Sequence, residues 1–190
     1  MKAVAFCGSA RKNGNTALLL KTVLEPLAAM GVDTEIVELA GTDISGCKAC
    51  MGCFKEKNQR CVFDNDVVNE CIEKMVAADV ILLGSPTYFA DISSEMKALV
   101  DRSGMVGRAN VDMFKRKLGA GVVAVRRAGA MHAFDSLNHF FLISEMIVVG
   151  SSYWNIGIGR EKGEVAGDEE GMNTMKTLGD NIGWLLEKLK

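Results

Sequence analysis

Short apolar runs rich in valine and isoleucine alternate with longer segments of helical periodicity along this 190-residue chain. The apolar runs predict strands at about residues 2–7, 34–39, 79–84, 119–125 and 146–149. The helical spacing predicts helices at about residues 15–30, 66–77, 93–103, 133–144 and 168–189. Strands that alternate with helices in this way form a parallel sheet covered by helices, which is an α/β fold.

The chain has the length of one domain, and no repeat, linker or low-complexity tract divides it, so we expect a single domain over residues 1–190. Five strands in one domain fit a flavodoxin-like three-layer sandwich with strand order 2-1-3-4-5. Ligands of such sheets bind beyond the carboxyl ends of the strands. The loops after the first, third and fourth strands are therefore the expected binding region.

The charge balance excludes some partners. Lys and Arg number 22 and Asp and Glu number 24, which gives a net charge of −2, so we expect no nucleic-acid partner and no binding to anionic membranes.

The apolar runs are too short to cross a bilayer. The N-terminal run ends at Cys7 and is too short for a signal peptide, so we expect a cytoplasmic protein.

The loop after the first strand, residues 8–16, reads Gly-Ser-Ala-Arg-Lys-Asn-Gly-Asn-Thr and opens directly onto a helix. Backbone N–H groups at a helix N-terminus bind phosphate, and the polar side chains of this loop add further donors. We expect the phosphate of a cofactor to be held by Ser9, Arg11, Asn13, Asn15 and Thr16. The alternative is a polar turn in which Asn15 and Thr16 only cap the helix.

Two other glycine patterns do not apply. The first loop matches neither the Walker A nor the dinucleotide fingerprint. Residues 119–124 match Gly-x-Gly-x-x-Ala, but their glycines precede an apolar run instead of opening a helix. We therefore predict a strand interior against which a helix packs closely.

The loops after the third and fourth strands are suited to a planar ring such as an isoalloxazine. Pro86, Thr87, Tyr88 and Phe89 offer an apolar wall with backbone donors and acceptors. Arg126 and Gly129 are expected at the far edge of such a ring, where a positive group stabilises negative charge on a reduced flavin. Alternatively, the aromatic residues only cover the sheet edge, and Arg126 is solvated or bridges subunits.

A polar segment at about residues 40–65 contains a cysteine run with the spacing Cys47-x2-Cys50-x2-Cys53-x7-Cys61. Such a long segment without periodicity is usually functional. Three thiolates at consecutive x2 spacing with a fourth farther on fit a four-iron, four-sulfur ([4Fe-4S]) cluster. A zinc site and a redox dithiol are the alternatives. Cys7 and Cys71 are expected to be small buried hydrophobic residues.

Four stretches together resemble the NADPH-dependent FMN reductase superfamily and, within it, the iron–sulfur flavoproteins. They are Gly8-Ser9-x-Arg11-x2-Gly14-Asn15-Thr16, the cysteine run before Asp64 and Asp66, Gly84-Ser85-Pro86-Thr87-Tyr88-Phe89, and Lys97-Ala98-Leu99-x-Asp101-Arg102. The resemblance covers about residues 1–159. It implies a flavodoxin-like fold that binds FMN non-covalently, with the first loop on the phosphate and residues 86–89 along the ring.

The resemblance also implies a [4Fe-4S] cluster on the four loop cysteines, and a homo-oligomer, a dimer or tetramer, in which cluster and flavin of adjacent subunits come close. One stretch departs from the pattern. Many relatives carry Gly-Gly-Gln-Glu after the fourth strand, where this chain has Gly129-Ala130-Met131-His132.

Three functions follow as hypotheses. The first is an FMN oxidoreductase that passes electrons between a reduced donor and an acceptor through FMN and the cluster. The second is an NAD(P)H-dependent FMN or quinone reductase whose cysteines hold zinc or nothing. The third is a non-enzymatic redox sensor that signals through the cysteine loop. The expected electron donor is a small molecule such as NAD(P)H or a ferredoxin-type protein, and no catalytic side chain is assigned.

Overall fold

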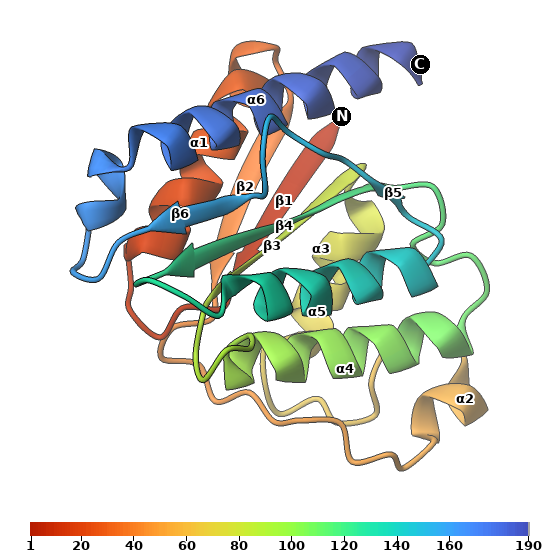
Figure 1. Ribbon diagram of the computed structural model, residues 1–190. Coiled ribbons are helices and arrows are strands. Elements are labelled where there is room, and N and C mark those ends of the chain that lie inside the picture. The colour runs from red at the N-terminus through yellow and green to blue at the C-terminus, as the bar shows by residue number, and fades with distance from the viewer. Residues whose placement is uncertain (190) are drawn as a thin grey trace.

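The computed structural model describes residues 1–189, which form one parallel sheet with helices on both faces (Figure 1). The sheet order is β2-β1-β3-β4-β5, and β6 pairs with β4 beside β5. The strands are β1 (Lys2–Cys7), β2 (Asp33–Glu38), β3 (Val80–Pro86), β4 (Leu118–Val125), β5 (Ile147–Val148) and β6 (Ile156–Ile158). The predicted order 2-1-3-4-5 is confirmed, while β6 is an addition that the sequence analysis missed.

The helices follow the predicted alternation. They are α1 (Asn15–Ala29), α2 (Gly52–Glu56), α3 (Val68–Ala77), α4 (Ser94–Ala109), α5 (Ala130–Ile143) and α6 (Glu169–Lys188), with a short 3-10 helix at Glu164–Gly167. The segment at 40–65 was expected to have no regular structure, but the five residues of α2 interrupt it. Within residues 1–189, none of the helices combines the length and the apolar character needed to cross a bilayer.

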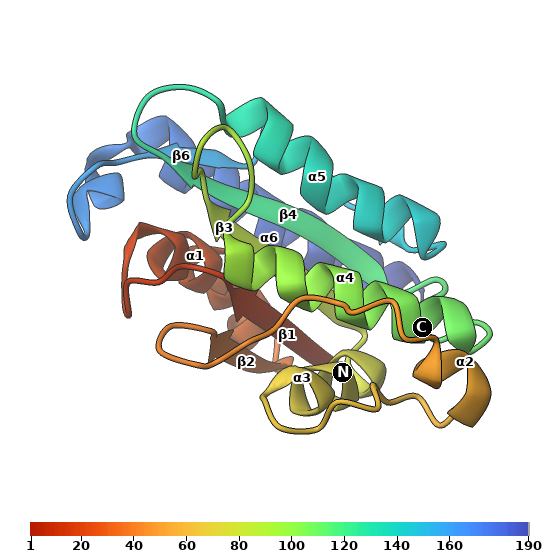
Figure 2. The same ribbon diagram turned by 90° about the horizontal axis from the view of Figure 1, so that it is seen from below.

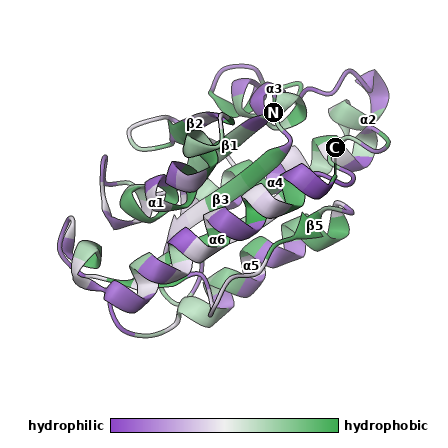
Figure 3. Cartoon of the chain, turned by 90° about the horizontal axis from the view of Figure 1, so that it is seen from above, coloured by the Kyte–Doolittle hydropathy of each residue, from purple (hydrophilic) through white to green (hydrophobic). Residues whose placement is uncertain are grey.

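The central strands are buried because helices cover both faces of the sheet. All residues of β4, and all of β3 except Pro86, are buried. Helices α1 and α6 cover one face and α3, α4 and α5 the other (Figures 1 and 2). Coloured by hydropathy, β3 is strongly apolar, while α4 and α6 alternate between polar and apolar bands, as amphipathic helices do (Figure 3).

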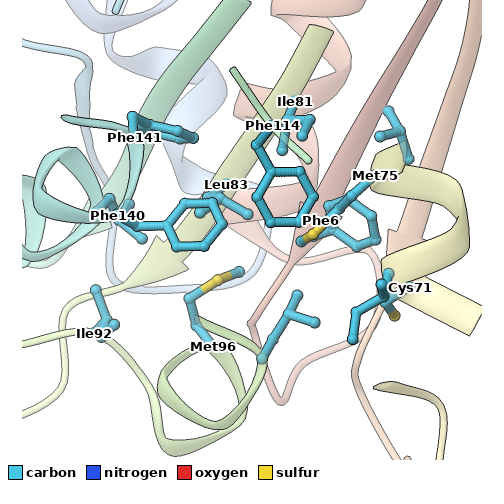
Figure 4. Packing of buried hydrophobic residues seen from close by; sticks show 14 of the residues in the cluster. Phe6, Cys71, Met75, Ile81, Leu83, Ile92, Met96, Phe114, Phe140 and Phe141 are labelled. Atoms are coloured by element: carbon cyan, nitrogen blue, oxygen red, sulfur yellow. The ribbon is translucent and has the colours of Figure 1, made fainter. Parts of the chain in front are cut away.

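The larger core lies between the sheet and helices α3 to α5 (Figure 4). Phe140 of α5 lies between Phe114 and Phe141, with ring centroids 5.8 and 5.7 Å away. Cys71 of α3 belongs to this core, and Cys7 of β1 belongs to the core on the other face. Burial raises the pKa of the Cys71 thiol to about 12 and that of Cys7 to about 11. Both behave as the small buried hydrophobic residues predicted.

The glycines of β4 are required by close packing. A Cβ atom at Gly119 would lie 2.6 Å from Cδ1 of Phe141, a ring that the core holds in place. The match to Gly-x-Gly-x-x-Ala therefore marks a strand against which α5 packs, as predicted.

Replacing Gly119 by Ala is expected to lower the free energy of unfolding by about 1–3 kcal/mol, the usual cost of overpacking a core. Gly150→Ala is the matched control, because no atom lies within 4 Å of the added methyl group. Urea unfolding of both variants measures the difference. Equal stabilities would show that α5 can move away from the sheet without cost.

Candidate functional site

A cleft of about 270 Å³ lies at the carboxyl ends of β1, β3, β4 and β6. These strand ends and the N-terminus of α1 meet at one end of the molecule (Figure 1). The predicted site residues that line the cleft are Ser9, Arg11, Asn15, Thr16, Pro86, Thr87, Tyr88 and Arg126. Three loops far apart in the sequence therefore converge where the parallel topology predicts.

The first loop presents the open N-terminus of α1 to the cleft. Gly14 is the N-cap residue and no side chain caps the helix, so the expectation that Asn15 and Thr16 are the caps is wrong. The reason is that Asn15 lies inside the first turn and binds another segment of the chain. Helix N–H groups without intrahelical partners are left facing the cleft, where they favour an anion.

Close packing and hydrogen bonds fix the first loop against the loop after β3. Ser93 donates its hydroxyl hydrogen to the carbonyl of Gly8 at 2.6 Å, and its N–H donates to Ser85 Oγ at 2.9 Å. A Cβ atom at Gly8 would lie 2.6 Å from Cβ of Met96, so only glycine allows this approach. The Arg11 N–H donates to Ser9 Oγ at 3.1 Å, which shapes the turn itself.

The segment after β6 completes the cleft and was missed in the sequence. Gly159, Arg160 and Lys162 line the cleft beside the first loop. Asn15 holds this segment with its side chain, because Nδ2 donates to the carbonyl of Glu161 at 2.9 Å and Oδ1 accepts from the N–H of Gly163 at 2.8 Å. The signal in the sequence was a pair of cations directly after the short apolar run at 156–158.

The loop after β3 forms a tight hairpin. Tyr88 and Asp91 exchange two backbone hydrogen bonds of 2.8 and 3.0 Å. The two residues between them, Phe89 and Ala90, both have positive φ, at 49° and 65°, as in a type I′ turn. The hairpin leaves the hydroxyl oxygen of Thr87 buried at the cleft without a hydrogen-bond partner.

Three residues assigned to the cofactor lie outside the cleft lining. Asn13 is in the turn, where its N–H donates to Glu38 at 2.8 Å. The side chain of Phe89 is fully exposed at the tip of the hairpin. Gly129, with φ of 85°, is the N-cap of α5, and a Cβ atom at this position would lie 3.1 Å from Ala90. Gly129 therefore supports the hairpin from behind.

The cleft is strongly cationic. Arg11, Arg126, Arg160 and Lys162 line it, and among the described residues no Asp or Glu lines it. The Arg11 guanidinium is held by the carbonyl of Arg160 at 3.2 Å, which leaves its other N–H groups for a ligand. This donor set, with the open helix N-terminus and the unpartnered Thr87 hydroxyl, fits a phosphate-bearing cofactor with a polar ring edge.

A second hollow lies between α4 and the cysteine loop, and all four loop cysteines line it. Cys47, Cys50, Cys53 and Cys61 meet Met105 and Val106 of α4 there. The segment between β2 and α3 runs along α4 and carries α2 at its far end (Figure 2). Burial raises the pKa of the Cys53 thiol, whereas Cys47 and Cys50 are exposed. All four thiols therefore border the same hollow, and their role as ligands stays a prediction.

The cysteine loop turns sharply between its sulfurs. Ala49, Met51, Lys57 and Gln59 all have positive φ, between 49° and 61°. Residues other than glycine rarely adopt this conformation, which costs about 1–2 kcal/mol each. Such strain clusters at ligand-binding segments and persists only where the surroundings hold it.

Polar residues of α3 and α4 hold the loop. The buried side chain of Asn69 accepts from the N–H of Cys61 at 2.7 Å and donates to its carbonyl at 2.9 Å. Asn110, the C-cap of α4, accepts from the N–H of Gln59 at 3.1 Å. The backbone at Cys61 and Gln59 is thus held by two buried asparagines.

Arg102 of α4 is the most buried cation of the chain and lies beneath the loop. It pairs with the carboxylate of Asp66, and its guanidinium donates to the carbonyls of Ser45 at 3.3 Å and Phe63 at 2.7 Å. Burial opposes the charge of Arg102, but Asp66 and the neighbouring Cys61 raise its pKa. Arg102 therefore ties the two ends of the cysteine loop together.

The spacing of the thiols bears on what they can hold. Within residues 1–189, no three side chains of His, Cys, Asp or Glu lie close enough together to bind one metal ion. A zinc ion needs its sulfur ligands all at about 2.3 Å from one centre. A cluster binds each thiolate to a separate iron, and the donor set that lines the hollow is four cysteines.

Comparisons with known proteins identify the family and the fold. A family model described as NADPH-dependent FMN reductase matches residues 1–161. An iron-sulfur flavoprotein of Methanocaldococcus jannaschii is 34% identical over 197 residues and spans all of both chains. Another, from Methanosarcina thermophila, is 32% identical and spans 100% of this chain and 97% of its own. A flavodoxin, WrbA-like protein of Agrobacterium tumefaciens has a TM-score of 0.69 at 13% identity, covering 100% of this chain and 98% of its own.

Proposed function

The chain belongs to the NADPH-dependent FMN reductase family, and from that premise we propose that it passes electrons between a reduced donor and an acceptor through FMN and a [4Fe-4S] cluster. Membership makes it a flavin-dependent oxidoreductase, which disfavours a non-enzymatic sensor. The observation that carries the proposal is the presence of two separate sites, a cationic cleft at the strand ends and a hollow lined by four cysteines.

The phosphate of FMN is assigned to the first loop. Ser9, Arg11, Asn15 and Thr16 line the end of the cleft at the open N-terminus of α1, and Arg160 and Lys162 add positive charge. Charge-assisted hydrogen bonds of this kind are the strong ones in phosphate recognition. Asn13, outside the lining, contributes through the shape of the turn.

The ring of FMN is assigned to the other end of the cleft. Pro86, Thr87 and Tyr88 line it there, and the Thr87 hydroxyl is available for the polar edge of the ring. Arg126 supplies positive charge where a reduced flavin carries negative charge. Phe89 and Gly129 influence the ring site only indirectly. Phe89 lies at the tip of the hairpin, and Gly129 lies against that hairpin.

The cluster is assigned to Cys47, Cys50, Cys53 and Cys61. The close relatives over the full chain are iron-sulfur flavoproteins by name. When bound, FMN exchanges electrons in pairs or singly and an iron–sulfur cluster exchanges them one at a time. The chain itself supplies position and electrostatics. NAD(P)H and a ferredoxin-type protein are the proposed donors.

A second copy of the chain is the proposed partner. Exposed apolar side chains gather on the edge formed by α5, β5 and the following loop: Leu142, Ile143, Ile147, Val148, Tyr153 and Trp154. Such patches mark interaction surfaces. A dimer or tetramer built on this edge would cover them, and analytical ultracentrifugation measures the subunit number.

Replacing Arg11 by Ala is expected to weaken FMN binding by about 1.5–3 kcal/mol, the value of a hydrogen bond to a charged group. Isothermal titration of the flavin-free protein with FMN measures the dissociation constant. Lys12→Ala is the control, because it removes a neighbouring positive charge that does not line the cleft. If both variants bind FMN like the unaltered chain, the phosphate does not lie at the first loop.

The two-cofactor proposal is tested by purifying the protein without exposure to oxygen. We expect flavin, about four iron atoms and four acid-labile sulfides per chain, with an EPR signal after reduction. Flavin without iron in such a preparation would favour a cluster-free NAD(P)H-dependent FMN or quinone reductase. Iron without flavin would overturn the assignment of the cleft.

A further inference from the structure

Arg102 has one nitrogen for which residues 1–189 offer no hydrogen-bond partner. Its side chain is 1% exposed. One terminal nitrogen binds Asp66 and the Ser45 carbonyl, and the other binds the carbonyl of Phe63. The third nitrogen, Nε, is buried and has no hydrogen-bond partner. An unsatisfied buried donor costs about 1–3 kcal/mol, so each one in a native fold calls for an explanation.

The position of Arg102 supplies that explanation. The same side chain lines the hollow on which the four cysteines converge. Because both terminal nitrogens are held by fixed partners, the planar guanidinium cannot turn its Nε–H elsewhere. A cluster bound in that hollow would bring sulfur atoms as hydrogen-bond acceptors.

We propose that Arg102 is a positioning residue that donates a hydrogen bond from Nε to a sulfur of the cluster or its thiolates, and so raises the reduction potential of the cluster. The inference rests on the proposed function. Hydrogen bonds to the sulfurs are one of the factors that set cluster potentials. A donor stabilises the reduced cluster more, because reduction adds negative charge. Asp66 largely neutralises the charge of Arg102, which leaves the directed N–H bond as its main contribution.

The pair Arg102→Lys and Asp66→Asn separates this role from a structural one. Lysine keeps a cation for Asp66, but a methylene group takes the place of Nε. Asparagine at position 66 leaves the Nε–H of Arg102 in place and removes the negative charge of Asp66. In anaerobically purified, cluster-loaded protein, Arg102→Lys should lower the cluster reduction potential by about 59 mV, a tenfold change for a one-electron couple. Asp66→Asn should raise it or leave it unchanged.

Spectroelectrochemical titration followed by EPR measures the two potentials. A purely structural role of Arg102 would reduce cluster content and thermal stability in both variants and leave the potential of the loaded fraction unchanged. That result overturns the inference. Unaltered protein that holds no iron would instead overturn the proposed function, so the two failures are distinguishable.

A measurement on the unaltered chain covers the case in which a variant does not fold. Protein grown with 15N-labelled arginine is reduced and examined by pulsed EPR. Coupling of a 15N nucleus to the reduced cluster is expected if Nε lies in hydrogen-bond contact with it. Loaded protein without this coupling would contradict the inference whatever the variants do.

Discussion

Cys50→Ser is expected to abolish iron and acid-labile sulfide while leaving FMN binding intact. Cys50 lines the second hollow and is exposed, so the exchange of sulfur for oxygen removes a ligand without disturbing the core. The cleft lies at the strand ends, and the lining of the cleft and that of the cysteine hollow share no residue. Iron and sulfide assays with the flavin absorbance of the same sample measure both outcomes.

Cys71→Ala is the matched control for this experiment. Cys71 is a buried core residue of α3 and does not line the hollow, so its variant should keep iron and lose only stability. Unchanged iron content in Cys50→Ser would rule out Cys50 as a ligand. Loss of flavin together with iron would instead mean that the cysteine loop supports the whole fold.

The second large effect is a loss of stability when the buried ion pair of Arg102 and Asp66, beneath the cysteine loop, is broken. Arg102→Met leaves the Asp66 carboxylate, whose side chain is 3% exposed, without its cation. Removing one partner of a buried pair lowers the free energy of unfolding by about 3–5 kcal/mol. Urea unfolding in a Cys50→Ser background excludes any contribution from the cluster.

Arg102→Lys in the same background is the control, since it keeps a cation for Asp66 and should lose less. Burial alone would raise the pKa of Asp66, but hydrogen bonds from Arg102 and from the N–H groups of Val68 and Ser45 lower it. Its stabilisation is therefore present at neutral pH and is lost only below about pH 4. Equal stability of the Met and Lys variants at neutral pH would show that the pair contributes little.

The strand order and the cleft could be predicted because they depend on local patterns. Apolar runs of four or five residues mark the buried strands, and a parallel sheet brings the loops that follow them to one end. β6 was not predicted because it has only three residues, Ile-Gly-Ile, and pairs only with the end of β4. The cleft residues that follow it were missed for the same reason.

Side-chain roles were harder to predict where a contact joins distant segments. Asn15 was expected to cap α1, yet it holds residues 161 and 163 instead. Arg102 stood in the sequence only as the last residue of the Lys-Ala-Leu-x-Asp-Arg motif. Its partner Asp66 lies 36 positions away, with α3 and β3 between the two residues in the sequence. No local periodicity encodes such a pairing.

The anchoring of the segment after β6 by Asn15 has a consequence for biosynthesis. One wall of the cleft is made by residues 159–162, and the partners that fix that wall, Arg11 and Asn15, are translated well before it. A nascent chain that has emerged from the ribosome only as far as β4 contains the first loop and the hairpin but not this wall. The lining of the cleft is therefore complete only after residues 159–162 have left the ribosome, and a ligand that needs this wall cannot be held before then.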